Sequence, residues 1–412
     1  MTISQFRPPP VPLGLRRRNV LLGLAGSWLQ RVLSAFGLLL PVFARTPVFA
    51  NTESAVTCGL PSHGLAPWMV QRRARLRGAL KSGFGVQYWG VTFSAEHLAA
   101  APHGVFIIET AKIGASATGQ TGEVFFLADE IRRIGHDGRR PVLGYLNLAK
   151  IEPYRDYWVD ALALAKGRDT LVQGDMPWIG PSLGRDGILA RYWTPEWTAV
   201  VMDRVDRLFA QGVDGLFLDD VLQYYEYYMG ALQGRAGFAA PGGPTSMVDF
   251  AGAMMELVIA VADRARQHDC AKLVIVNNGV FIGRDAGEDP PESRRQDTFD
   301  RYRSAIDGIL IESVFASGGD DTTISALHDE FASTGIPVLT IDFADAAQNA
   351  PTAETRATIA KRALAEDFTP YIADDAAFNR LYHRQRWHGL FPYRHKTQLQ
   401  RRTGPALGRG TS

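Results

Sequence analysis

The sequence predicts an α/β protein in which a single domain forms a (β/α)8 TIM barrel. Short, nearly continuous apolar runs recur along the chain, as expected for strands that are covered on both faces. Longer amphipathic stretches separate these runs, and strand and helix alternate about eight times over roughly 300 residues. A doubly wound open sheet is the alternative. It is disfavoured because no G-x-G-x-x-G motif follows the first strand.

The predicted elements follow from these two periodicities. Strands are expected at 84–90, 104–110, 140–148, 214–220, 273–278, 307–313, 336–343 and 369–374. Apolar residues at helical spacing predict helices at 68–81, 123–135, 195–212, 246–267, 324–335 and 354–366. Gly212 and Gly335 stand where a helix C-terminal glycine is expected.

Three intervals, 149–194, 221–245 and 279–300, are longer than a plain crossover needs. Each of them follows a strand, so we expect them on the C-terminal face of the barrel, where active sites are built. Gly and Pro are dense in 229–245, which predicts a mobile loop there.

The first 50 residues resemble an export signal, in which Arg16, Arg17 and Arg18 precede two apolar runs. The arginine run is similar to a twin-arginine signal, and small residues before Asn51 suit a peptidase cut. A membrane anchor is disfavoured because Gln30 and Arg31 interrupt the apolar stretch. We therefore expect a signal at 1–50, a linker and N-terminal helix at 51–82, the barrel at 83–386 and a flexible basic tail at 387–412. The mature protein is expected in the periplasm or outside the cell, with no stable membrane span.

Composition restricts the function further. Hydrophobic residues make up 46% and charged residues 21% of the chain, which is ordinary for a globular domain. Without the first 50 residues, 38 basic residues stand against 43 acidic ones, which disfavours a nucleic-acid partner. No HExxH motif or Cys/His cluster is present, so we expect no metal and no cofactor. Cys58 and Cys270 could form one disulfide or remain separate thiols.

One pattern occurs twice: DGLFLDD at 214–220 and DGILIES at 307–313. Side chains alternate along a strand, so Asp219 shares a face with Phe217, and Glu312 shares one with Leu310. An acid at the end of an apolar strand is expected at the barrel mouth, and we expect two strands between these acids, which then face each other across it. Two carboxylates are what glycoside hydrolysis requires. The alternative is that each acid only caps the turn that follows.

Other strand ends are also polar, which predicts an acid-rich, aromatic cup above the barrel. Aromatic faces can stack on sugar rings. The substrate-binding candidates are Tyr88, Trp89, Glu109, Lys112, Tyr145, Asn147, Glu152, Asp220, Asn277 and Asp342.

Five segments together resemble glycoside hydrolase family 114, the endo-α-1,4-polygalactosaminidase-like secreted TIM barrels. They are YLNLAKIEPYRDYW (145–158), ARYWTPEW (190–197), GVDGLFLDDV (212–221), DGILIES (307–313) and TPYIADDAAFNRLY (369–382). The resemblance implies that Asp219 and Glu312 are the catalytic pair and that the substrate is an α-1,4-linked galactosamine-containing polysaccharide.

The chain departs from the family pattern after the third strand, where the motif tends to read Tyr-Leu-Ser-Ile-Gly-Glu-x-Glu. This chain has Ala149 and Lys150 and keeps only Glu152. A lysine in place of a glutamate disfavours a cationic galactosamine at that position.

Two other functions stay open at this stage. One is a non-catalytic carbohydrate-binding barrel, in which the acids only hydrogen-bond to sugar hydroxyls. The other is a lyase or aldolase that uses Lys112 or Lys150 as a Schiff base.

Overall fold

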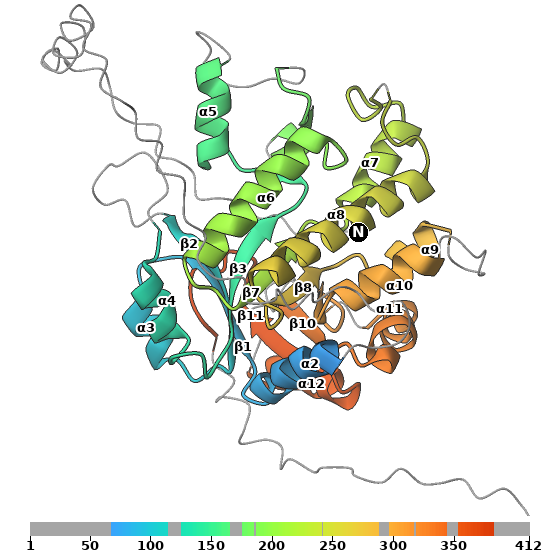
Figure 1. Cartoon of the computed structure of the whole chain (residues 1–412). Coiled ribbons are helices and arrows are strands. Elements are labelled where there is room, and N and C mark those ends of the chain that lie inside the picture. The colour runs from blue at the N-terminus through green and yellow to red at the C-terminus, as the bar shows by residue number, and fades with distance from the viewer. Residues whose placement is uncertain are drawn as a thin grey trace, which may run out of the picture.

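The computed structural model describes residues 67–113, 125–164, 175–184, 187–240, 242–287, 296–316, 319–343 and 353–382. Eight strands form one sheet in the order β1-β2-β3-β7-β8-β9-β10-β11, and all of its pairs are parallel (Figure 1). Neighbours along the chain are thus neighbours in the sheet, with no switch of direction as in a doubly wound fold. The predicted (β/α)8 barrel is confirmed.

All eight predicted strands are present, most of them a residue or two shorter than expected. They are β1 (Phe84–Trp89), β2 (Val105–Ile113), β3 (Val142–Asn147), β7 (Gly215–Asp219), β8 (Leu273–Asn277), β9 (Gly308–Glu312), β10 (Val338–Phe343) and β11 (Thr369–Ala373). Figure 1 shows the helices around this sheet. They are α2 (Pro67–Leu80), α3 (Ala95–Ala100), α4 (Ala128–Ile134), α5 (Asp156–Leu164), α6 (Pro195–Ala210), α7 (Gln223–Leu232), α8 (Met247–His268), α9 (Ile282–Asp285), α10 (Gln296–Ala305), α11 (Asp321–Ala326) and α12 (Ala353–Ala365).

The longer helices begin where the sequence provides caps. The Thr194 side chain accepts a hydrogen bond from Trp197 N at the start of α6, with a proline in the first turn. Ser246 and Asp249 form a capping box at the start of α8. Gly212 and Gly335 have φ of 91° and 81°, the left-handed conformation expected just after a helix.

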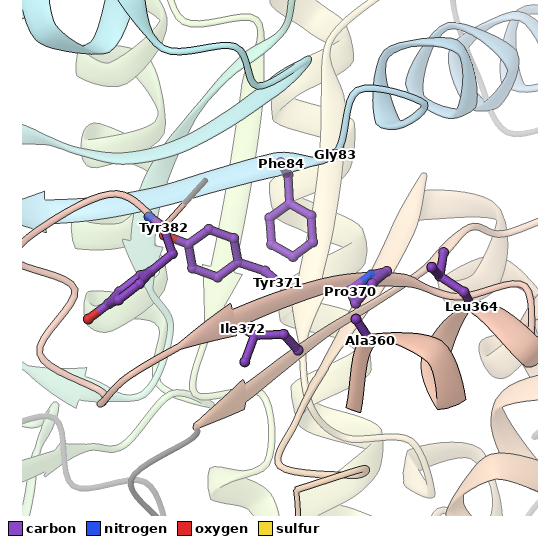
Figure 2. A pocket seen from close by; sticks show the side chains of 8 residues that line it. All are labelled: Gly83, Phe84, Ala360, Leu364, Pro370, Tyr371, Ile372 and Tyr382. Atoms are coloured by element: carbon purple, nitrogen blue, oxygen red, sulfur yellow. Dashed lines mark hydrogen bonds between the residues drawn. The ribbon is translucent and has the colours of Figure 1, made fainter. Parts of the chain in front are cut away.

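The barrel is almost closed at the seam between β11 and β1. The Tyr371 hydroxyl donates to Val86 O (3.1 Å), and Tyr88 N donates to Phe378 O (2.8 Å). The segment 377–382 therefore bonds to β1 in the place of a further strand. A small apolar pocket lies beside this seam, where the rings of Phe84 and Tyr371 are 5.3 Å apart between centroids (Figure 2).

The interior of the barrel is a packed apolar core. It is filled by inward-facing residues of the strands, among them Val86, Ile107, Phe217, Ile275 and Leu310. Leu76 and Leu80 of α2 belong to the same cluster, so α2 closes the end of the barrel opposite the strand C-termini. The other end is left for polar side chains.

The first aspartate of each repeated motif anchors this closed end. The Asp307 side chain, fully buried, accepts from Val274 N (2.9 Å), Arg72 Nε (2.8 Å) and Arg266 Nη2 (2.9 Å). Asp214 similarly accepts from Val142 N (3.0 Å) and from an arginine of α2. Each aspartate thus ties the start of the preceding strand to the helix that plugs the barrel.

Some details differ from the sequence-based expectations. A single strand, β8, lies between β7 and β9, so the expectation of two intervening strands is wrong and the two acids are closer neighbours. The interval 149–194 contains a small sheet of β4 (Lys150–Ile151), β6 (Ile188–Ala190) and β5 (Ile179–Ser182), which the apolar pattern did not predict. The expected loop at 229–245 begins within α7, and its Phe238 is buried.

The predicted export signal and the basic tail lie outside the described residues. Cys270 is in a disulfide bond, whereas Cys58, the other cysteine in the sequence, also lies outside them. Among the described residues, none of the helices has the length and apolar character that a membrane span requires.

Replacing Asp307 with alanine is expected to lower the free energy of unfolding by about 3–5 kcal/mol, because Arg72 and Arg266 keep buried charges without their partner. Urea denaturation monitored by circular dichroism measures this change. Glu256→Ala removes an exposed ion pair with Arg301 and serves as a control that should cost at most about 1 kcal/mol. Equal losses in the two variants would contradict the anchoring role of Asp307.

Candidate active site

Three consecutive strands end in the same way at the open end of the barrel. Asp219, Asn277 and Glu312 are the last residues of β7, β8 and β9. The residues that follow them, Asp220, Asn278 and Ser313, have φ of 61°, 62° and 60°. A left-handed residue other than glycine costs roughly 1–2 kcal/mol, so three in a row at one rim mark a strained, specialised edge.

Asn277 brings the two predicted catalytic acids together. Its Nδ2 lies 2.8 Å from Asp219 Oδ1 and 2.8 Å from Glu312 Oε1. Those two oxygens are therefore no further apart than twice 2.8 Å. Carboxyl groups about 5–5.5 Å apart are typical of retaining glycosidases, and those about 6.5–9.5 Å apart of inverting ones.

Asp219 accepts hydrogen bonds from three directions. Besides Asn277, the Tyr145 hydroxyl donates to its Oδ2 (3.0 Å) and Asp220 N donates to its Oδ1 (2.8 Å). The Tyr145 hydroxyl in turn accepts from Asn147 Nδ2 (3.0 Å). Tyr88 packs against Tyr145 with 4.8 Å between ring centroids, and this contact fixes the ring under the carboxylate.

Electrostatics at this position favour a shared proton. Burial, followed by the charges of Asp220 and Glu312, raises the pKa of Asp219 to about 7. The hydrogen bond from Asn277 and the charge of Lys150 act in the opposite direction. Because Asp219 and Glu312 repel each other when both are ionised, the pair keeps one proton up to about neutral pH. A pair that carries one proton suits acid and base chemistry.

Asp220 is held by a second set of partners beside the pair. Its side chain accepts from Asn147 Nδ2 (2.6 Å) and Gln223 Nε2 (2.9 Å), and Lys150 Nζ lies 3.4 Å away. Asn147 therefore links Tyr145 to Asp220. The ion pair favours the ammonium form of Lys150, whereas a Schiff base requires the neutral amine.

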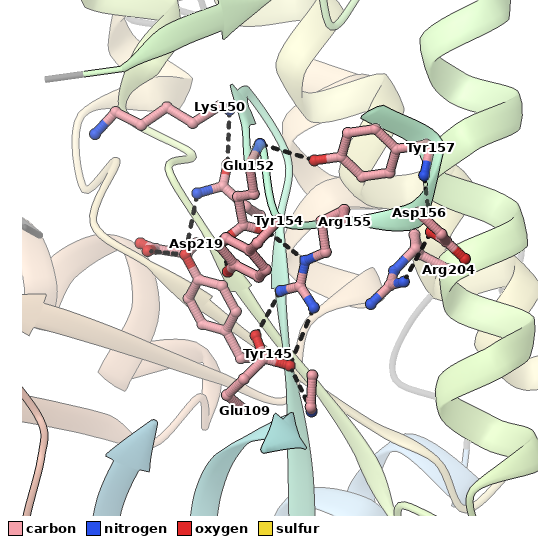
Figure 3. Close-up of polar contacts among 12 residues, drawn as sticks. Glu109, Tyr145, Lys150, Glu152, Tyr154, Arg155, Asp156, Tyr157, Arg204 and Asp219 are labelled. Carbon is pink, nitrogen blue, oxygen red and sulfur yellow. Dashed lines mark hydrogen bonds and ion pairs between the residues drawn. The ribbon is translucent and has the colours of Figure 1, made fainter. Parts of the chain in front are cut away.

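Glu109 and Glu152 are joined by a buried arginine (Figure 3). Arg155 bonds to Glu109 at 2.5 and 3.2 Å and, through Nε, to Glu152 at 2.8 Å. Tyr154 also donates to Glu152 (2.6 Å). Burial raises the pKa of Glu152, and the charge of Arg155 opposes this. The cluster attaches the segment after β3 to the middle of β2, so these two acids support the rim through Arg155.

Two further candidates bond to the protein itself. The Trp89 indole N–H donates to Ala377 O (2.7 Å), which orients the ring at the seam. Asp342 is fully buried and accepts from Phe315 N (2.7 Å) and Ala316 N (2.8 Å), so it shapes the turn after β9. Lys112 falls within β2, but its side chain lies outside the described part of the chain.

The sequence-based candidates did not include two residues that the structure places here. Gln223 contacts Asp220 from the first turn of α7, and no sequence signal marks it. Arg155 stands three residues after Glu152, a spacing that could have suggested an ion pair. Among the described residues, no group of three or more His, Cys, Asp or Glu side chains is arranged to hold a metal ion.

The fold is a TIM barrel with two carboxylates close together at its C-terminal mouth, an arrangement that glycoside hydrolases use. Residues 122–389 match the model of glycoside-hydrolase family GH114. This match covers more than half of the sequence, so the chain belongs to that family.

Relatives at lower similarity share part of their length with this chain. A protein of Deinococcus radiodurans is 25% identical over 242 residues, which are 57% of this chain and 64% of that protein. One of Thermotoga maritima is 27% identical over 178 residues, which are 43% and 47%. The chain thus spans less than two thirds of these curated relatives.

Solved structures are more distant. The glycoside hydrolase domain of PelA from Pseudomonas aeruginosa is 14% identical, with a TM-score of 0.45 over 73% of this chain and 96% of that one. Aspergillus fumigatus Ega3 in complex with galactosamine is 13% identical, with a TM-score of 0.47 over 73% and 93%. Likenesses of this size carry no functional information on their own.

The raised pKa of Asp219 predicts a pH-dependent stability. The folded state holds a proton that the unfolded chain loses near pH 4, so this contribution is full below about pH 4 and is lost as the pH rises through about 7. Asp219→Asn removes the group. Relative to the wild type, this variant should gain stability between pH 4 and pH 8, by on the order of 4 kcal/mol, since each unit of the pKa shift is worth about 1.4 kcal/mol. Urea unfolding across that range measures the difference, and parallel pH profiles of the two proteins would refute it.

Proposed function

We propose that the protein is an exported glycosidase that cleaves an α-1,4-linked galactosamine-containing or related polysaccharide by a retaining, two-carboxylate mechanism. The observation that carries this proposal is the single Asn277 amide that bonds to Asp219 and Glu312 at once. It keeps one oxygen of each acid within twice 2.8 Å of the other, which agrees with the separation typical of retaining glycosidases.

The surroundings of the two acids assign their roles. Asp219 and Glu312 share one proton up to about neutral pH, and the amide, phenol and backbone N–H that donate to Asp219 stabilise its carboxylate when that proton lies on Glu312. We assign Asp219 as the nucleophile and Glu312 as the acid and base. When Asp219 attacks the anomeric carbon, Glu312 gives its proton to the glycosidic oxygen as the bond to the leaving sugar breaks. Glu312 then takes a proton from water, which attacks the glycosyl ester and releases Asp219.

The charge of the mouth supports an amino sugar as the substrate. Asp219, Asp220 and Glu312 face the ammonium of Lys150, which is already paired with Asp220. An acid excess attracts a cationic ring. Lys150 reduces that excess, so partly acetylated polymers are included in the proposed substrate class.

Export is part of the proposal. It is supported by the arginine run and apolar stretch of the first 50 residues and by the disulfide at Cys270, since such bonds persist in oxidising compartments. The polysaccharide substrate would then meet the enzyme outside the cytoplasm.

Asp219→Asn and Glu312→Gln are each expected to lower kcat at least about 1,000-fold on a partly deacetylated α-1,4-galactosaminoglycan, because each removes a group that takes part in bond cleavage. Reducing-end assays measure turnover, and circular dichroism checks folding. Full activity in both variants would exclude the mechanism. Polymer binding by a wild type that does not cleave would instead indicate the non-catalytic carbohydrate-binding alternative.

The stereochemical course gives a separate test. The short separation of the carboxyl groups predicts that the first product carries the α-anomeric configuration of the substrate. Proton NMR during the first minutes of hydrolysis distinguishes the anomers before mutarotation. An initial β-anomer would show inversion and would overturn the assignment of Asp219 as a nucleophile.

A further inference from the structure

We infer that Asn277 is a positioning residue that holds the nucleophile and the acid/base together through one amide group, and that it does not bind substrate. This inference rests on the proposed glycosidase function and extends it. The sequence had suggested Asn277 only as a substrate ligand.

The position of Asn277 on β8 places its side chain between the two acids. Asn277 ends the strand that lies between the strands of the two acids, and the residue is 3% exposed. Its NH₂ group has two hydrogens, one for each carboxylate, at equal distances of 2.8 Å. Both donors are thus used within the protein, which leaves none for a sugar hydroxyl.

The oxygen of the Asn277 side-chain amide also restricts how the amide can lie. Asn277 Oδ1 is buried and has no hydrogen-bond partner among the described residues. A buried acceptor without a partner costs free energy. Rotating the amide by 180° would place this oxygen against two carboxylates, and the repulsion between these acceptors would cost more free energy than the unpaired oxygen does. The acids therefore fix the amide in the one orientation that serves both of them.

Each of the two acids changes its charge during double displacement. The nucleophile is neutral while it is part of the ester, and the acid/base alternates between its two forms. A neutral donor shared by both can stabilise whichever of them is ionised, without the fixed charge of a lysine or arginine. Other groups also face the pair: Asp220 at the end of β7, Lys150 on β4, Tyr145 on β3 and Tyr88 on β1.

The neighbouring asparagine offers a matched control. Asn278 Oδ1 accepts from the backbone N–H of Glu312 (3.2 Å), so it orders the same strand end without touching either carboxylate through its amide. Asn278 has φ of 62°, and glycine adopts this conformation without strain. Asn278→Gly therefore removes a contact of the rim and leaves the shared donor in place.

Asn277→Ala and Asn277→Asp test the inference. The alanine variant removes the donor, and the aspartate variant replaces it with a third carboxylate of the same shape. Both are expected to lower kcat about 100-fold or more while KM changes less than about threefold, since a misplaced pair slows chemistry but not binding. The acid limb of the pH–rate profile should move to higher pH in both, and it should stay in place in Asn278→Gly.

A readout without substrate separates this inference from the proposed function. Carboxyl ¹³C NMR follows the titration of the Asp219 and Glu312 pair in the folded protein. Asn277→Ala should raise the apparent pKa of the pair, and Asn278→Gly should not. If this shift occurs in a protein that cleaves no polymer, the glycosidase proposal fails and the positioning role stands.

Two results would overturn the inference. An unchanged titration in folded Asn277→Ala shows that the amide does not stabilise the acids. A rise in KM with kcat and the pH profile unchanged shows that Asn277 is a substrate ligand instead.

Discussion

Two carboxylates cannot be packed side by side in a partly buried rim unless neutral donors surround them, and this constraint shapes the whole open end of the barrel. Around Asp219 the donors are an amide, a phenol and a backbone N–H. Each comes from a different place: β8, β3 and the turn after β7. The registers of these strands must therefore all be correct before the pair can form.

The two copies of the Asp-Gly motif show how one short pattern serves both ends of a strand. Its first aspartate lies at the closed end, where Asp214 and Asp307 bond to the start of a neighbouring strand and to arginines of α2. Its second acid lies at the open end, five residues further on. Gly215 permits the close passage of β8, because a Cβ there would come within 2.4 Å of Leu273 O. One end of the strand anchors the barrel, and the other carries an acid of the proposed catalytic pair.

Much of the barrel was predictable because continuous apolar runs and helical spacing are local signals. All eight strands and the acids at the ends of β7 and β9 were found in this way. The partners of the other acids were not predictable, because a contact such as that of Arg155 with Glu109 depends on how distant segments meet. Asp342 was predicted to bind substrate at the rim because it stands near the end of an apolar strand. Its carboxylate instead accepts from backbone N–H groups of the turn after β9, a contact between distant segments that the sequence does not reveal. The small sheet in 149–194 was missed because its strands are only two to four residues long.

The seam between β11 and β1 has a consequence for biosynthesis. The segment 377–382 bonds to β1 from the far end of the barrel sequence, so the edge of the earliest strand stays uncovered until nearly the whole domain has left the ribosome. An uncovered strand edge invites pairing with other chains. The late covering of β1 therefore leaves the growing chain open to such pairing during synthesis.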